Sequence, residues 1–371
     1  MRERLSLSEI LDHKENQDMR AIVIDGYKKL AHEADVPEPA VGGGDVLIRV
    51  AAAGLNMIDE KIRVGEFKAL LPYRMPLTLG HDVAGTVIRV GAGVSLFKRG
   101  DEVYARSRDH RIGTFAERIA IDQADVALAP ASIGMVEAAS LPLVALTAWQ
   151  ALVEIGKVTA GHRVLIHAGA GGVGTIAIQL ARHLGARVAT TASAGNADFL
   201  RELGADVVID YRTQDFAAEL SGYDFVLDSL GGENLEKSMR VLRRGGTAVG
   251  IAGPPTPAFA RKMGLNPVLR VAIRALSHKV RSRAAKLGVR YEFLFMRADG
   301  VQLRTIAELV DAGAIRPIVG ATFPFDRAPE ALSALHVGGT RGKSVLLAPD
   351  ARSPHPSSAA ITADNERGTP S

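Results

Sequence analysis

The sequence predicts an α/β protein in which a β-rich domain is followed by a doubly wound parallel sheet, and three observations support this prediction. The chain has 371 residues, a length typical of about two domains. Before about Pro142, short apolar segments are separated by Gly, Pro and Asp turns, with no long helical pattern between them. From Leu143 onward, short apolar segments alternate with helical patterns, as expected for a parallel sheet.

The β-rich domain is expected over residues 19–142. Residues 1–18 hold five acidic side chains and no continuous apolar run, so we expect a loose N-terminal extension and no export signal. The strands expected after it are Ala21–Ile24, Val46–Ala53, one within 79–91, one within 98–104 and Gly113–Ile121.

The alternating part is expected over residues 143–313. Helical patterns cover Leu143–Ile155, the segment after the glycines at 169–174, Asn196–Leu203 and Glu233–Leu242. The strands expected between them are Arg163–His167, Arg187–Thr191, Asp206–Ile209, Phe225–Asp228 and Thr247–Ile251. The elements expected later are a helix ending over Glu308–Gly313, a helix over Ala328–Leu335, and strands over Ile315–Ala321 and Lys343–Leu347. The tail 350–371 is rich in Ser, Pro, Ala and Thr, and we expect it to be disordered.

A glycine turn joins the buried strand Arg163–His167 to the helix that follows. It consists of Gly169, Ala170, Gly171, Gly172, Val173 and Gly174. Strand, G-x-G-x-x-G and helix form the context in which this motif binds a dinucleotide, because the free N–H groups at the helix start face the pyrophosphate. In this reading Gly169 makes the tight turn, Gly171 admits the pyrophosphate and Gly174 lets helix and strand pack closely.

Composition excludes several classes of site. The chain has no cysteine, so disulfides, thiolate zinc sites, iron–sulfur clusters and a cysteine nucleophile are excluded. No apolar run reaches ~18 residues, so we expect no transmembrane helix. We therefore expect a cytoplasmic protein that acts on a small molecule and has no nucleic-acid partner.

The net charge of +4 is unevenly distributed. Residues 258–291 carry nine Lys or Arg and no acid, which leaves 4 − 9 = −5 for the rest of the chain. Apolar residues recur there every three or four positions, so we expect one amphipathic helix over about 267–290 with a basic outer face. The favoured interpretation is a solvated helix that covers the active-site cleft or forms a subunit contact. Binding to a membrane or to an acidic partner is the less favoured alternative.

Six short signatures connect the chain to a known family. They are Gly54-Leu55-Asn56 with Asp59, Leu79-Gly80-His81-Asp82-Val83-Ala84-Gly85, Leu146-Thr147-Ala148-Trp149, the glycine turn, Leu203-Gly204-Ala205-Asp206 and Arg341-Gly342-Lys343. With these residues, the chain from Met19 to Leu347 resembles the zinc-free quinone oxidoreductase and enone reductase branch of the medium-chain dehydrogenase/reductase superfamily. The resemblance implies a GroES-like catalytic domain over 19–142, completed by 314–349. It also implies a Rossmann domain over 143–313 with the basic segment, about 254–291, as an insertion, and a homodimer.

The residues argue against a catalytic zinc ion. Zinc alcohol dehydrogenases of the superfamily have Cys where Asn56 stands and His where His81 stands. An open zinc site needs three protein ligands, so His81 alone does not make one. We therefore expect no metal and interpret His81 as a structural or pocket residue.

The nucleotide is expected to be NADPH. The strand Arg187–Thr191 runs into a segment without the acid that binds the ribose hydroxyl of NAD. In the quinone oxidoreductase pattern a Ser, a Lys and a Tyr surround the 2′-phosphate; Ser193 and Tyr211 match the first and last, whereas Asn196 stands at the Lys position. Arg212 is the candidate to supply the missing charge.

The resemblance also implies where the nicotinamide and the substrate lie. Asn56 and Thr147 are placed beside the nicotinamide, and Arg341 and Lys343 are assigned to the cofactor site. Phe293 and Phe295 belong to a segment where the family has an apolar wall near the nicotinamide, although a plain core strand is equally consistent with its pattern.

A proton donor is not identified by the sequence. The nearest candidates are Asp59, Lys61, Tyr73 and His81, while Asp59 and Asp82 are equally consistent with structural roles. The family often has an aromatic residue after the Asp59 position; here it is Glu60, which leaves the usual substrate-stacking surface in doubt.

Without a metal, conjugated acceptors are favoured because they distribute the negative charge that hydride transfer creates. The predicted function is NADPH-dependent reduction of a quinone or of the C=C bond of an α,β-unsaturated carbonyl. The alternatives are a zinc-free alcohol dehydrogenase, an enoyl-thioester reductase, and a non-catalytic NADPH-binding adaptor for a membrane or partner.

Overall fold

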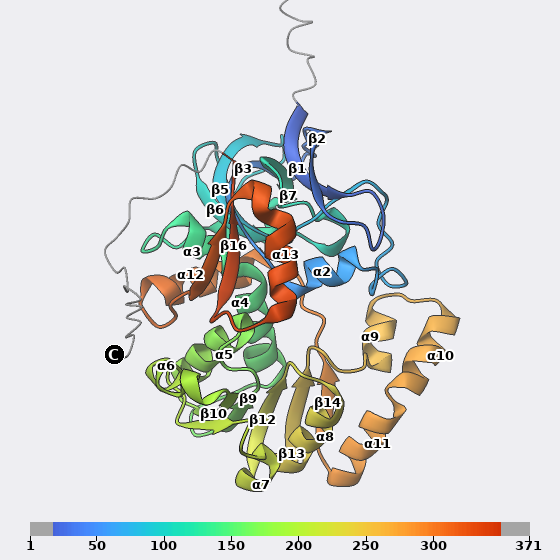
Figure 1. Cartoon of the computed structure of the whole chain (residues 1–371), viewed down its shortest axis with the longest axis vertical. Coiled ribbons are helices and arrows are strands. Elements are labelled where there is room, and N and C mark those ends of the chain that lie inside the picture. Colours follow the sequence, from blue (N-terminus) through green and yellow to red (C-terminus); the bar gives the residue numbers. More distant parts are fainter. Residues whose placement is uncertain (1–17, 350–371) are drawn as a thin grey trace, which may run out of the picture.

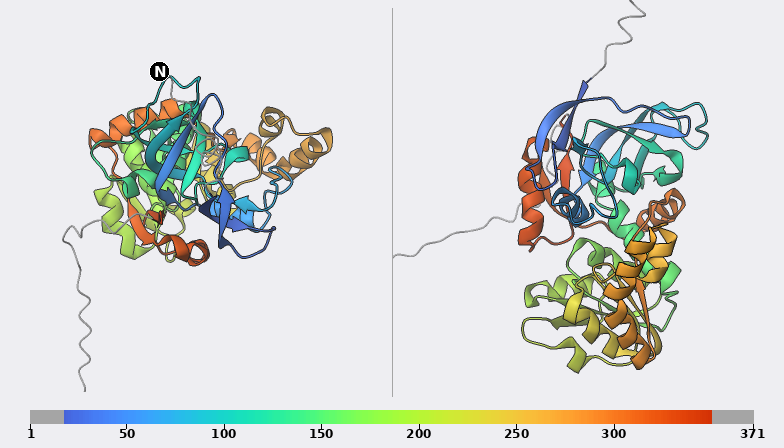
Figure 2. Two further views of the ribbon diagram at one scale, coloured as in Figure 1. Left: turned by 90° about the horizontal axis from the view of Figure 1, so that it is seen from above. Right: turned by 90° about the vertical axis from the view of Figure 1, so that its right-hand side faces the viewer.

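The computed structural model describes residues 18–349, which form two domains stacked along the long axis of the molecule (Figure 1). The extension over 1–17 and the tail 350–371 lie outside the described residues. Asp18, which we assigned to the extension, instead begins β1 (Asp18–Ile24), where it pairs with Pro37. The right-hand view of Figure 2 shows that the last strand lies in the same domain as the N-terminal strands.

A seven-stranded sheet is the centre of the GroES-like domain. Its order is β15-β16-β3-β5-β6-β8, with β7 paired to β3. The strands are β3 (Asp45–Gly54), β5 (Asp82–Val90), β6 (Glu102–Arg106), β7 (Arg118–Asp122), β8 (Val126–Leu128), β15 (Val319–Phe323) and β16 (Lys343–Leu347). A smaller sheet has the order β2 (His32–Pro37), β1 and β4 (Leu77–Thr78). Because β16 pairs antiparallel with β3, the C-terminal residues complete the domain that the N-terminal residues begin.

The Rossmann domain contains a six-stranded parallel sheet with the order β11-β10-β9-β12-β13-β14. The strands are β9 (Arg163–Ile166), β10 (Arg187–Ala192), β11 (Val207–Asp210), β12 (Tyr223–Asp228), β13 (Leu242–Gly250) and β14 (Arg290–Phe293). Val164, Leu165 and Ile166 of β9 are fully buried, as its continuous apolar run predicts for a central parallel strand. The strands all run the same way, so their carboxyl ends meet at one edge, where doubly wound sheets bind ligands.

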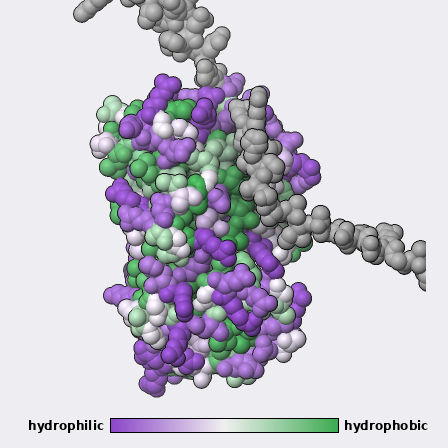
Figure 3. All heavy atoms as spheres, turned by 90° about the vertical axis from the view of Figure 1, so that its left-hand side faces the viewer, coloured by the Kyte–Doolittle hydropathy of each residue, from purple (hydrophilic) through white to green (hydrophobic). Residues whose placement is uncertain are grey.

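Helices cover both domains. They are α2 (Met57–Arg63), α3 (Met135–Ala139), α4 (Pro142–Trp149, continued by a π-helical stretch over Gln150–Ile155), α5 (Gly172–His183), α6 (Ala197–Glu202), α7 (Phe216–Glu219), α8 (Gly232–Val241), α12 (Gly300–Asp311) and α13 (Ala328–Val337). The face that carries α3, α6 and α12 is mainly hydrophilic over its Rossmann half (Figure 3). Among residues 18–349, no helix combines the length and apolar character needed to cross a membrane.

The basic segment is not the single helix that its periodicity predicts. It forms α9 (Pro257–Lys262), α10 (Pro267–Leu276) and α11 (His278–Leu287), here called the insertion (257–287). The break falls at Ser277, which is buried and whose hydroxyl donates to the carbonyl of Ile273 at 2.8 Å. Such back-bonding competes with the regular helix and bends it. The insertion projects from the side of the molecule (Figures 1 and 2).

Candidate active site

A cavity of about 450 Å³ is lined by residues of both domains. The GroES-like domain contributes Asn56, Lys61, Phe67 and Arg106 to it, and the Rossmann domain contributes Gly171, Gly172 and Val173 of the glycine turn. The segment Phe293–Met296 lines it as well and gives it an apolar wall. The cavity thus brings a helix start together with an aromatic surface.

A side chain at each of the three motif glycines would meet different surroundings, so each glycine is required for a different reason. A Cβ on Gly169 would lie 2.1 Å from Thr190 Oγ1, and one on Gly174 would lie 2.4 Å from the carbonyl oxygen of Ala168. A Cβ on Gly171 would meet only that same carbonyl, at 3.3 Å. Tight contacts at the first and last glycine hold strand against helix, whereas Gly171 keeps the approach from the cavity open.

The start of α5 therefore fits the diphosphate of a dinucleotide. Gly171, Gly172 and Val173 line the cavity, and Gly172 begins a 12-residue helix. The N–H groups of a first helical turn have no partner within the helix, and the helix dipole favours an anion there. Gly169, Ala170 and Gly174 form the turn beneath this surface and do not line the cavity.

The loop after β10 lies beside a residue from the far end of the chain. Asn196 Nδ2 donates to Ser193 Oγ at 3.0 Å, and Arg341 Nε donates to Asn196 Oδ1 at 2.7 Å. Tyr211 is 60% exposed just after the neighbouring strand β11, and the guanidinium of Arg212 lies over its ring at 5.9 Å. The structure thus places Arg341, and not Arg212, against Asn196.

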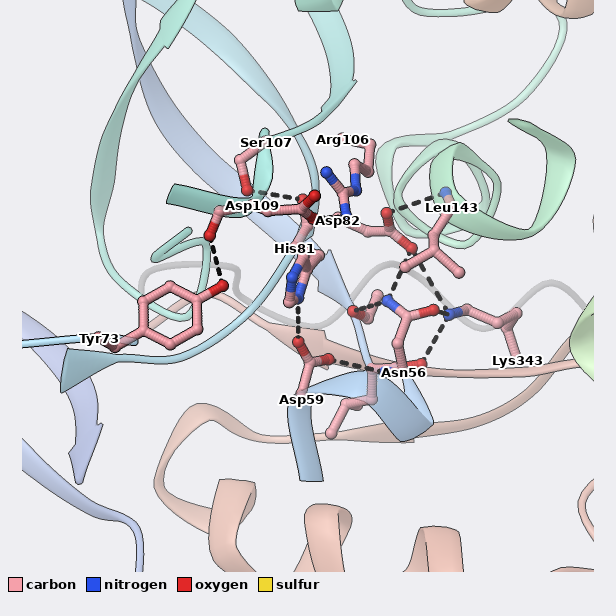
Figure 4. Close-up of polar contacts among 12 residues, drawn as sticks. Asn56, Asp59, Tyr73, His81, Asp82, Arg106, Ser107, Asp109, Leu143 and Lys343 are labelled. Atoms are coloured by element: carbon pink, nitrogen blue, oxygen red, sulfur yellow. Dashed lines mark hydrogen bonds and ion pairs between the residues drawn. The ribbon is translucent and has the colours of Figure 1, made fainter. Parts of the chain in front are cut away.

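Asn56 and Lys343 form the centre of a buried polar network (Figure 4). Lys343 Nζ donates to Asn56 Oδ1 at 2.5 Å and to the carbonyl of Leu55 at 2.6 Å. It also lies 3.5 Å from Asp82 Oδ2, which accepts from Asn56 Nδ2 at 2.9 Å. Burial lowers the pKa of Lys343 and raises the pKa of Asp82, while the attraction between the two charges acts in the opposite direction.

These residues do not fit a zinc ion. The amide of Asn56 stands where a thiolate ligand would be needed, and the ammonium of Lys343 already contacts its oxygen. His81 offers one ring nitrogen to Asp59. Within residues 18–349, no group of three His, Cys, Asp or Glu side chains is arranged to hold a metal.

Three of the four proton-donor candidates do not line the cavity. Asp59 and His81 are fully buried and contact one another, with 2.5 Å between Asp59 Oδ1 and His81 Nδ1. Asp59 also accepts from the backbone N–H of Asn56 at 2.8 Å, so it fixes the start of α2. The hydroxyl of Tyr73 donates to the carbonyl of Asp109, and burial raises the pKa of Tyr73. Only Lys61 lines the cavity; its ammonium lies 3.7 Å from Glu66.

Phe67 and Arg106 are among the cavity residues that sequence reasoning missed. Phe67 supplies an aromatic surface, with its ring centroid 6.0 Å from that of Phe295. Glu60 does not line the cavity and instead binds Arg63 and His336. Arg106 ends β6 with 1% of its surface exposed and pairs with Asp109. An aromatic residue in a loop and an arginine at a strand end carry no sequence signal that would have identified either.

Comparisons with known proteins agree with this architecture. Residues 42–131 match the model of the alcohol dehydrogenase GroES-like domain family, and residues 203–346 match that of the zinc-binding dehydrogenase family. The chain is 36% identical to the mitochondrial NAD(P)H oxidoreductase RTN4IP1 of Homo sapiens over 88% of this chain and 89% of that protein. It is 33% identical to the chloroplastic NADPH-dependent alkenal/one oxidoreductase of Arabidopsis thaliana, over 89% of this chain and 80% of that protein. The solved structure of the quinone oxidoreductase from Coxiella burnetii superposes with a TM-score of 0.78 at 32% identity, over 90% of this chain and 100% of that one.

Proposed function

The chain belongs to the medium-chain dehydrogenase/reductase superfamily of oxidoreductases, and we propose that it transfers hydride from NADPH to a quinone or to the C=C bond of an α,β-unsaturated carbonyl. Relatives named as an NAD(P)H oxidoreductase, an alkenal/one oxidoreductase and a quinone oxidoreductase support this choice of acceptor. As expected from the sequence, the reaction is proposed to proceed in the cytoplasm without a metal.

One observation carries the proposal: the start of α5 and the aromatic wall line the same cavity. A dinucleotide whose diphosphate lies at Gly171 and Gly172 would extend its nicotinamide along this cavity toward Asn56 and Thr147. Phe67, Phe293 and Phe295 would then offer the acceptor an apolar, planar environment. Such a surface suits a conjugated ring or enone better than a small polar alcohol.

Charge at the cavity supports the same class of reaction. Three cationic side chains line it, Lys61, Arg106 and Lys343, and no Asp or Glu does. Bound NADPH supplies a hydride, which leaves the oxygen of a conjugated acceptor with negative charge. Positive side chains fixed in a water-poor site stabilise that charge. Lys61, the most accessible of the three, is the proposed proton source for the acceptor oxygen, by direct transfer or through water.

Choice of NADPH over NADH rests on the loop after β10. The loop has no carboxylate that would repel a 2′-phosphate. It contains Ser193 and Asn196, which are hydrogen-bonded to one another, and Tyr211 follows the neighbouring strand β11. Arg341 contributes a guanidinium at Asn196, the position where the quinone oxidoreductase pattern has a lysine. We propose that Arg341 is the main contact for the 2′-phosphate, with Arg212 as a second one.

NADPH oxidation by the purified protein tests the proposal. The acceptors are enones, quinones and enoyl thioesters, and alcohols are tested with NADP⁺ in the reverse direction. We expect enones or quinones to be turned over fastest, and bulky apolar acceptors to be preferred over small polar ones. Turnover only of thioesters or alcohols would replace the proposed acceptor class. Absence of any turnover by protein that binds NADPH would favour the non-catalytic adaptor.

A further inference from the structure

Helix α10 presents an apolar face to solvent. Val268, Val271 and Leu276 are 77%, 69% and 64% exposed, and only Ile273 of this helix is buried. Residues 268, 271, 272, 275 and 276 follow three- and four-residue spacing, so they share one side of the helix, and all five are exposed. The apolar side of a surface helix normally faces the core. Here its residues are exposed, on an insertion that projects from the side of the molecule (Figure 2, left).

The same insertion is strongly basic. Residues 258–291 carry nine Lys or Arg and no acid. Lys279 pairs with Glu236 of α8 at 2.5 Å. Arg261, Arg270 and Arg274 are exposed, and none of them forms an ion pair with an acid of residues 18–349. Arg274 lies three positions after Val271 and borders the apolar face, whereas Arg270 lies on the opposite side of α10. An exposed apolar face bordered by an unpaired guanidinium group suits a surface that is both apolar and anionic.

The insertion also contacts the wall of the active-site cavity. The ring of Phe259 in α9 lies 5.2 Å from that of Phe293 and 5.7 Å from that of Phe295. Both partners line the cavity. The insertion that carries α10 is therefore in contact, through α9, with the wall that would receive the acceptor.

We propose that the exposed face of α10 binds the surface of an anionic lipid bilayer. Val268, Val271 and Leu276 would insert at the level of the headgroups, and Arg274, at the edge of this face, would pair with a lipid phosphate. A second copy of the chain fits less well, because a symmetric contact would bring Arg274 of both copies together. The membrane would then supply a lipid-soluble acceptor to the cavity. Delivery of the acceptor, unlike the lipid contact, rests on the proposed function.

Co-sedimentation with vesicles tests the lipid contact without cofactor or acceptor. Vesicles of phosphatidylcholine alone are compared with vesicles that also contain phosphatidylglycerol. We expect binding to the anionic vesicles only, weakening as salt is raised. Val271→Ser with Leu276→Ser should lower the bound fraction about tenfold, and Arg274→Gln about fivefold.

A matched control uses exposed apolar residues elsewhere. Val301 of α12 and Val337 of α13 are 68% and 87% exposed, so Val301→Ser with Val337→Ser removes similar apolar surface and should leave vesicle binding unchanged. Equal binding of both vesicle types, or unchanged binding of the α10 variants, overturns the proposal. A change from dimer to monomer in the α10 variants without vesicle binding also overturns it and assigns this face to a subunit contact.

A second measurement separates the source of the acceptor from the reaction itself. A long-chain quinone embedded in anionic vesicles should be reduced at least about fivefold more slowly by the Val271→Ser, Leu276→Ser variant, with a short-chain soluble quinone reduced at the wild-type rate. Equal rates with the embedded quinone would overturn delivery from the membrane. Failure of the wild-type protein to reduce the soluble quinone would count against the proposed reaction, whereas the vesicle result would stand by itself.

Discussion

Arg341 and Asn196 are 145 positions apart, yet Arg341 Nε donates to Asn196 Oδ1 at 2.7 Å. Arg341 also donates to the carbonyl of Gly195 at 2.9 Å, and its guanidinium lies over the ring of Phe199 at 5.2 Å. Arg341 lies two residues before β16, the C-terminal strand that completes the GroES-like domain, whereas its partners follow β10 of the Rossmann sheet. This contact therefore ties the two domains together at the loop expected to hold the 2′-phosphate.

Replacing Arg341 tests its assignment to that phosphate. Arg341→Ala should raise the KM for NADPH about tenfold or more, because a hydrogen bond to a charged group is lost, and should change the KM for NADH less than about twofold. Steady-state kinetics with both nucleotides provides the measurement. Arg212→Ala is expected to have a smaller effect.

Arg201→Ala is the control for general charge loss near this loop, because Arg201 is an exposed arginine of α6 that pairs only with Asp198 among the described residues. An equal loss of NADH and NADPH use in the Arg341 variant would mean that Arg341 holds the domains together without recognising the phosphate.

The glycine turn allows binding to be separated from folding. Gly171→Ala adds a methyl group with one contact at 3.3 Å, so the protein should fold normally, whereas the methyl group would point at the pyrophosphate. Gly174→Ala places a carbon 2.4 Å from a backbone oxygen. The resulting strain should lower the free energy of unfolding by about 1–3 kcal/mol.

Thermal unfolding and NADPH titration distinguish the two variants. We expect Gly171→Ala to keep the wild-type melting temperature and bind NADPH at least about tenfold more weakly. Wild-type affinity for NADPH in a folded Gly171→Ala protein would show that the diphosphate does not bind beside Gly171.

The buried pair of Lys343 and Asp82 makes a stability prediction. Lys343→Met leaves the fully buried carboxylate of Asp82 without its cation, which should lower the free energy of unfolding by about 3–5 kcal/mol. Adding Asp82→Asn removes the remaining charge and should recover much of the loss. Denaturant unfolding of both variants measures this. A single variant that loses under about 1 kcal/mol would show that Asp82 is neutral in the native protein.

The glycine turn and the elements with a clear apolar run could be predicted because their signals are local. β16 was placed residue for residue, and strand β9 with helix α5 followed from the apolar run before the glycines. β4 and α7 were missed because their two and four residues show neither a continuous apolar run nor a clear spacing of apolar residues. The bend at Ser277 was missed because its cause, a side-chain bond to the carbonyl of Ile273, does not interrupt the apolar spacing.

The candidate site was predictable where the resemblance to the family supplied its residues. The resemblance brought Asn56, Thr147, Phe293 and Lys343 to one cavity, and the structure places all four on its wall. Asp59 and His81 have residue types suited to proton transfer, but whether such residues face a cavity depends on packing between distant strands. Here they face each other in the interior. The Arg341 contact with Asn196 likewise depends on how the two domains meet.

His167 provides a prediction about pH. It is 2% exposed at the end of β9, between Thr191 Oγ1 at 3.0 Å and Ser238 Oγ at 2.8 Å. Burial lowers the pKa of His167 from 6.5 to about 4, because the charged ring is poorly solvated there. Between these two values the unfolded chain binds a proton that the native chain does not.

Acidification through that window should therefore destabilise the native protein, by about 3 kcal/mol from this residue once pH 4 is reached. In His167→Gln, which keeps a donor and an acceptor, the free energy of unfolding should fall less steeply between pH 6.5 and pH 4. Denaturant unfolding across this range measures both slopes. His183→Gln, an exposed histidine of α5, is the control and should follow the wild-type curve. A neutral His167 ring donates to one of its two hydroxyl partners and accepts from the other. Parallel curves for wild type and His167→Gln would mean that His167 is charged in the folded protein and donates to both.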